Sequence, residues 1–163
     1  MNKYLTNILR PTVFVLAATL AQPIFAADGN MNSNMEILSQ KIKADKKLVV
    51  AANMELTDAE AKAFWPIYDA YQNDLQQINQ RMVTVINDYA LAYNKGAVLD
   101  GTAKKLLDDS IAIELAEANL KKSYVPKLSK ALPSAKVARY IQIENKIRAI
   151  IRYELADAIP LVK

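Results

Sequence analysis

From residue 64 to residue 93 an apolar or aromatic side chain recurs at every third or fourth position, and no other feature constrains the fold as strongly. Side chains with this spacing share one face of an α-helix, whereas a strand alternates at every second position. The row is long enough for coiled-coil-like packing against another helix. Its members are Phe64, Ile67, Tyr68, Tyr71, Leu75, Ile78, Met82, Val85, Ile86, Tyr89 and Tyr93.

Local signals mark both ends of this predicted helix. Thr57 is a natural N-cap, and Glu60 three residues later completes a capping box. The Asn-Lys-Gly sequence at residues 94–96 is typical of a helix C-terminus. Pro66 lies inside the run and has no N–H to donate. We therefore expect the helix either to kink there or to restart near residues 63–65.

Three further segments show helical periodicity, at about residues 33–52, 100–132 and 134–158. Pro126 should bend the segment that contains it. The chain has only three glycines, too few for the turns of a β-sandwich or barrel. The joints between segments are short, which favours antiparallel neighbours. We predict an all-α fold of four helices, organised around a long antiparallel helical hairpin.

The first 26 residues read as a secretory signal peptide. Basic residues precede an apolar run at positions 12–21, and Gln-Pro at 22–23 ends that run before Ala26. A membrane anchor is the alternative, but a span needs about 20 apolar residues and this run has about half of them. We predict cleavage after Ala26, a periplasmic location, and one all-helical domain over residues 27–163.

Missing residue types exclude most enzyme classes. The chain has no cysteine, which excludes disulfides, thiolate nucleophiles and iron–sulfur clusters. It has no histidine, which excludes the Ser-His-Asp triad and imidazole metal ligands. Glu114 and Glu117 have helical spacing, but no nucleophile lies near them in the sequence. We expect no enzymatic activity, no catalytic residue, no cofactor and no metal ion.

Charge is distributed unevenly along the chain. Residues 121–152 carry nine basic side chains and one acid, Glu144, whereas residues 27–99 carry seven bases and nine acids. This asymmetry indicates either a solvated basic face or attraction of an acidic polypeptide or anionic headgroups. The basic residues would allow peripheral binding to a membrane surface. We expect no nucleic-acid partner, because no recognition motif is present. The candidate residues are Lys121, Lys122, Lys127, Lys130, Arg139, Arg148 and Arg152.

The last helical segment has a wide apolar arc, covering about half of its circumference at the α-helical spacing of 100° per residue. One neighbouring helix needs a stripe of only about 100°. The excess predicts a second neighbour, and the sequence leaves open whether that neighbour is a second chain or a bound polypeptide. Glu144 and Arg148 are spaced to pair within the arc. The candidate contact residues are Ile143, Ile147 and Ile150.

Aromatic side chains gather at the start of the long helix. Phe64, Trp65 and Tyr68 surround the proline at position 66. Two interpretations stay open for them: core packing around a proline, or an amphipathic aromatic surface that contacts partners.

Residues 56–60, Leu-Thr-Asp-Ala-Glu, resemble the motif of the LTxxQ family of periplasmic proteins. Leu56 and Thr57 match, and Glu60 stands where the family has Gln. A second copy would begin at Leu132, with Pro133 in place of Thr and Lys136 in place of Gln. The resemblance implies a cradle-shaped antiparallel homodimer with an ATP-independent chaperone or envelope-stress role. Residues 64–71 and 132–162 also resemble an uncharacterised exported helical family with Phe-Trp-Pro and Ile-Pro-Leu-Val signatures.

Two functions follow from these observations. The first is a periplasmic chaperone-like protein that binds unfolded or envelope polypeptides through a basic and apolar helical surface. The alternative is a regulatory or structural partner of a single envelope protein, without catalysis.

Overall fold

The structure is a computed structural model that describes residues 45–162. The prediction of an all-α fold is confirmed, because 88% of the described residues are helical, in four helices and without a strand. These helices are a short one over residues 45–54, α3 (Asp58–Asn94), α4 (Asp100–Ala131) and α5 (Ser134–Ala158). The predicted signal peptide, its cleavage site and residues 33–44 of the first predicted segment lie outside the described residues.

The helix boundaries follow from the local signals of the sequence. Thr57 caps α3, and Lys95 and Gly96 end it with hydrogen bonds to the carbonyls of the last turn. Gly96 has φ +108°, a conformation that favours glycine over any residue with a Cβ. Pro66 and Pro126 lie inside uninterrupted helices. The expectation that α3 restarts near residues 63–65 is therefore wrong, and a single missing donor is tolerated within this long helix.

The described residues divide between two compact units. The hairpin unit contains residues 56–141 together with 161 and 162. The arm unit contains residues 45–55 together with 142–160. The helix α5 begins in the hairpin unit and ends in the arm unit.

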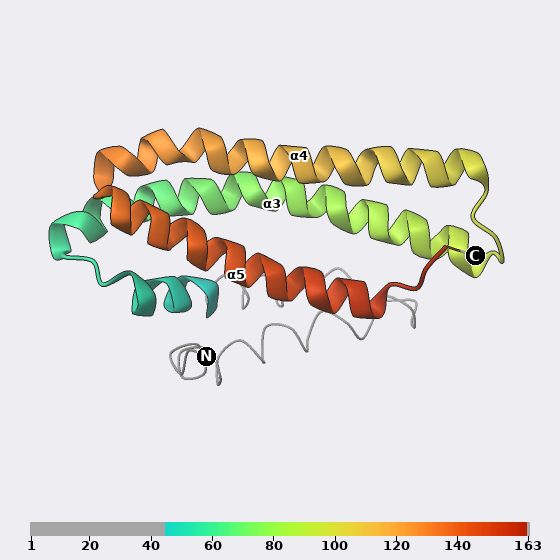
Figure 1. The fold of residues 1–163 in the computed structure, drawn as a ribbon, viewed down its shortest axis with the longest axis horizontal. Coiled ribbons are helices and arrows are strands. Elements are labelled where there is room, and N and C mark those ends of the chain that lie inside the picture. The colour runs from blue at the N-terminus through green and yellow to red at the C-terminus, as the bar shows by residue number, and fades with distance from the viewer. Residues whose placement is uncertain (1–44, 163) are drawn as a thin grey trace, which may run out of the picture. The chain divides into compact units, whose positions relative to one another are not determined.

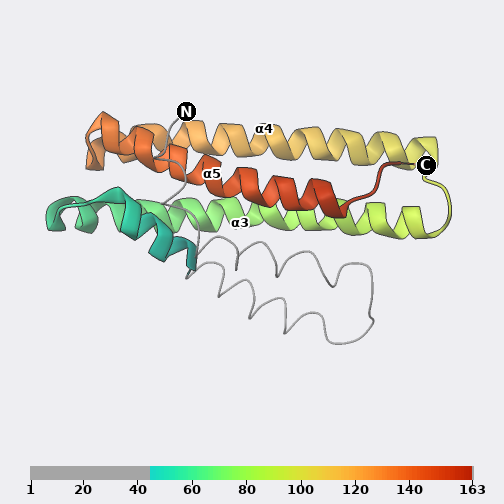
Figure 2. The same cartoon turned by 60° about the horizontal axis from the view of Figure 1, so that its bottom comes forward.

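In the hairpin unit, α3 and α4 lie side by side and antiparallel (Figures 1 and 2). The joint over residues 95–99 is short, so the chain reverses directly into α4. The first part of the apolar row predicted for α3 is buried, whereas the members from Met82 to Tyr93 are half-buried. Burial of apolar side chains on both helices supplies the main stabilisation of such a hairpin. The buried positions are Phe64, Tyr68, Tyr71, Leu75 and Ile78 on α3, and Leu106, Ile113, Tyr124 and Leu128 on α4.

Candidate interaction surfaces

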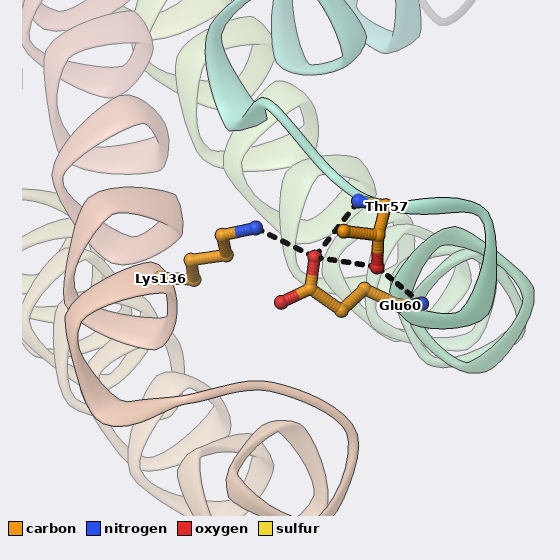
Figure 3. Close-up of polar contacts among 3 residues, drawn as sticks. All are labelled: Thr57, Glu60 and Lys136. Atoms are coloured by element: carbon orange, nitrogen blue, oxygen red, sulfur yellow. Dashed lines mark hydrogen bonds and ion pairs between the residues drawn. The ribbon is translucent and has the colours of Figure 1, made fainter.

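The starts of α3 and α5 are joined by one carboxylate (Figure 3). The Glu60 backbone N–H donates to Thr57 Oγ1 at 3.3 Å, and Glu60 Oε2 accepts from the Thr57 backbone N–H at 2.8 Å. Lys136 Nζ, in the first turn of α5, donates to the same Oε2 at 2.6 Å. The hydrogen bond from Lys136, followed by that from the Thr57 backbone, lowers the pKa of Glu60 below its ordinary value.

This arrangement connects the two segments that resemble a repeated motif. Glu60 and Lys136 occupy the last position of residues 56–60 and 132–136, and the structure brings these two positions into contact. Leu56 is half-buried, and Leu132 is buried just before α5. Comparison of each segment with the motif alone counts Glu60 and Lys136 as two mismatches to Gln and does not show that they pair. The sequence signal for the pair was that the two opposite charges occupy the same position in their segments.

The aromatic residues at the start of α3 form a core cluster around Tyr140 of α5. The Tyr140 ring centroid lies 5.1 Å from that of Phe64 and 6.0 Å from that of Tyr68, both in edge-on geometry. Tyr140 is fully buried, and its hydroxyl accepts from Gln72 Nε2 at 3.3 Å. Phe64 and Tyr68 are only 0% and 2% exposed, so the interpretation of these two as a partner surface is corrected to core packing. Trp65 stays half-buried beside Phe64.

A buried tyrosine ties α4 to α3 at the other side of this cluster. The Tyr124 hydroxyl donates to Asp74 Oδ2 at 2.6 Å, and its ring lies 5.2 Å from the Tyr71 ring. Burial, then the hydrogen bond to the Asp74 carboxylate, raises the pKa of Tyr124 to about 12. Lys127 Nζ lies 3.9 Å from the centre of the same ring, a cation–π distance.

The predicted basic residues differ in their exposure. Lys121 lies 3.5 Å from the buried carboxylate of Glu117, and Lys136 is paired with Glu60. Of the predicted bases in the hairpin unit, four are exposed on the last turns of α4 and the first turns of α5, and these are Lys122, Lys127, Lys130 and Arg139. In the arm unit, Arg148 is half-buried and Arg152 is exposed.

An exposed apolar row runs along α4, away from its buried row. Leu107, Ile111 and Leu115 have exposed fractions of 60%, 50% and 60%, and Val125 has 39%. At the α-helical spacing these four residues span an arc of about 80°. Lys122 is exposed and falls within the same arc. This row was not among the predicted contact residues, although the four-residue spacing of its first three members was visible in the sequence. Contiguous exposed apolar surface of this kind marks interaction sites.

The wide apolar arc of α5 has a neighbour from its own chain. In the arm unit, Lys46 Nζ of the short helix donates to Glu144 Oε2 at 2.7 Å. Helical spacing had suggested Arg148 as the partner of Glu144, and it could not reveal this long-range bond. Ile147 is buried, so its prediction as open contact surface is corrected, whereas Ile143 and Ile150 are half-buried.

Within residues 45–162 no helix is both long and apolar enough to cross a membrane. The same part of the chain contains no cluster of acidic side chains that could hold a metal ion. The sequence matches no protein-family model, no curated protein and no solved structure.

Proposed function

We propose that this protein is a periplasmic, ATP-independent chaperone-like protein that binds unfolded or envelope polypeptides. The observation that carries the proposal is the exposed apolar row of α4, which ends among the exposed lysines of the same helix. Apolar side chains supply short-range contact with unfolded chains, whose own apolar groups are open to solvent. The lysines supply long-range attraction to acidic segments.

Binding of this kind needs no catalytic group. Such binding requires a stable scaffold that holds apolar side chains exposed to solvent. The buried aromatic cluster and the hairpin core form this scaffold. The expected binding weakens with salt, because charge attraction is screened over about 8–10 Å at physiological ionic strength.

The test is light scattering from a denatured, aggregating client protein, with and without an equimolar amount of this protein, in the absence of ATP. We expect suppression of aggregation that is weaker at high salt. Replacing Ile111 and Leu115 together with serine should abolish most of it. Leu91→Ser on α3 is the matched control, because Leu91 is also exposed, at 62%, but lies outside the α4 row.

Charge reversal tests the second component of the surface. Lys122→Glu together with Lys130→Glu should reduce suppression at low salt and have little effect at high salt. Lys95→Glu, an exposed lysine beyond the end of α3, is the control. Absence of suppression at any ratio contradicts the proposal. Saturable one-to-one binding to a single envelope protein would favour the regulatory alternative instead.

A further inference from the structure

The short helix over residues 45–54 has one largely buried face. Lys46 forms the 2.7 Å ion pair with Glu144, and the two side chains are 12% and 4% exposed. Val50 and Met54 follow Lys46 at four-residue intervals and are both fully buried. One helical face therefore buries a cation and two apolar side chains together.

The ion pair makes this docking specific. Glu144 is the only acid between residues 121 and 152, and it lies buried within the apolar arc of α5. A buried carboxylate that loses its cationic partner is strongly destabilising. The α5 face thus discriminates in favour of a helix that carries a cation at this position, and residues 45–54 provide one.

The connection from this helix to α3 is short and strained. It consists of residues 55–57, and Glu55 has φ +49°, a left-handed conformation that is unfavourable for a residue with a Cβ. The capping box at Thr57 fixes the start of α3 on the other side. The left-handed conformation is therefore confined to one residue of this short connection. Short hinges under strain favour exchange of an element between copies, because opening relieves the hinge and every docked contact can form again in the other copy.

We propose that helix 45–54 is exchanged between two copies of this chain. In the exchanged dimer, Lys46 of each protomer bonds Glu144 of the other protomer. The partner that fits this carboxylate is a second copy, because its helix 45–54 carries the complementary cation at the matching position. The dimer uses neither the α4 row nor the exposed lysines, so its test is independent of polypeptide binding.

A charge-exchange experiment tests whether the helix can dock between chains, and the oligomeric state of the unaltered protein and of the double variant tests whether it does so when docking within one chain is also open. Lys46→Glu and Glu144→Lys are prepared as two separate proteins, and each alone places like charges together in both kinds of docking. In a mixture, however, both contacts of an exchanged heterodimer join opposite charges. We expect each protein alone to be monomeric and the mixture to form a one-to-one heterodimer, detected by native mass spectrometry and light scattering. Its dissociation constant should be at least about a hundredfold lower than that of either homodimer.

The matched control applies the same design to an exposed pair. Lys104 and Asp108 form a 2.6 Å ion pair on the surface of α4, with side chains 77% and 61% exposed. A mixture of Lys104→Glu and Asp108→Lys should show the same monomer–dimer equilibrium as either protein alone. The double variant Lys46→Glu, Glu144→Lys reports on folding, since it restores opposite charges within one chain and should dimerise like the unaltered protein.

Two results would overturn the proposal. One is an unaltered protein and a double variant that are both folded and monomeric, which restricts the docking to a single chain whatever the mixture does. The other is dimerisation of each single variant at the level of the unaltered protein. A second measurement addresses the hinge: Glu55→Gly removes the cost of the left-handed conformation and should shift the equilibrium toward monomer. An unchanged equilibrium in that variant contradicts the role assigned to hinge strain.

Discussion

Two leucines of α3 allow the predicted core face to be tested with one substitution in two environments. Leu75 is 7% exposed in the hairpin, whereas Leu91 on the same helix is 62% exposed. Leu75→Ala removes buried apolar atoms and leaves a cavity, which costs about 2–5 kcal/mol of unfolding free energy. Leu91→Ala removes a side chain that is mostly in water, and alanine is a good helix former, so the change should stay within about 0.5 kcal/mol.

The size of the chain converts these energies into melting temperatures. Unfolding entropy is about 2.1 cal/mol/K per residue, so 1 kcal/mol corresponds to about 3 °C for a protein of 163 residues. Leu75→Ala should therefore lower Tm by about 6–15 °C, and Leu91→Ala by less than about 2 °C. Thermal and urea unfolding followed by far-ultraviolet circular dichroism measures both variants. Equal shifts for the two would refute the assignment of the buried face of α3.

The remaining predictions concern the cap and two titrating groups. Thr57→Ala should destabilise the protein by about 1 kcal/mol in urea unfolding, because α3 loses its N-cap. A cost below about 0.3 kcal/mol would contradict the cap's contribution to stability. The lowered pKa of Glu60 adds stability that is present above the ordinary value of 4.5 and is lost as pH falls through the lower folded-state pKa. The stability difference between the unaltered protein and Glu60→Gln should therefore shrink on acidification across this range, and a constant difference would argue against the pair with Lys136. Raising the pKa of Tyr124 from 10.0 to about 12 adds stability that is full below pH 10 and is lost as pH rises through 12. Ultraviolet titration should show a late tyrosine ionisation that is absent from Tyr124→Phe, and Asp74→Asn should move that ionisation to lower pH.

The sequence predicted the helices well because their signals are local. The capping box at Thr57 and the glycine at position 96 each act within one turn, and the structure places helix ends beside both. The recurrence of apolar side chains at every third or fourth position likewise identifies the buried face of a helix without information from the rest of the chain.

The side-chain partners were harder to predict because they depend on which helices meet. The sequence around Phe64 and Tyr68 is compatible with either a core or a surface position. Their contact with the Tyr140 ring, which is distant in sequence, places them in the core. Lys46 and Glu144 are far apart in sequence, and helical spacing could suggest only residues of α5 as partners of Glu144. The exposed row of α4 was visible as a pattern, but its exposure follows from the side on which α3 packs.

The place of Tyr140 in the chain has a consequence for synthesis. A chain leaves the ribosome N-terminus first, so α3 and α4 emerge before Tyr140. Until then the rings of Phe64, Tyr68 and Tyr71 lack the side chain that all three contact. The aromatic site of the hairpin therefore stays unfilled until the first turns of α5 are available, and the core cannot close before then.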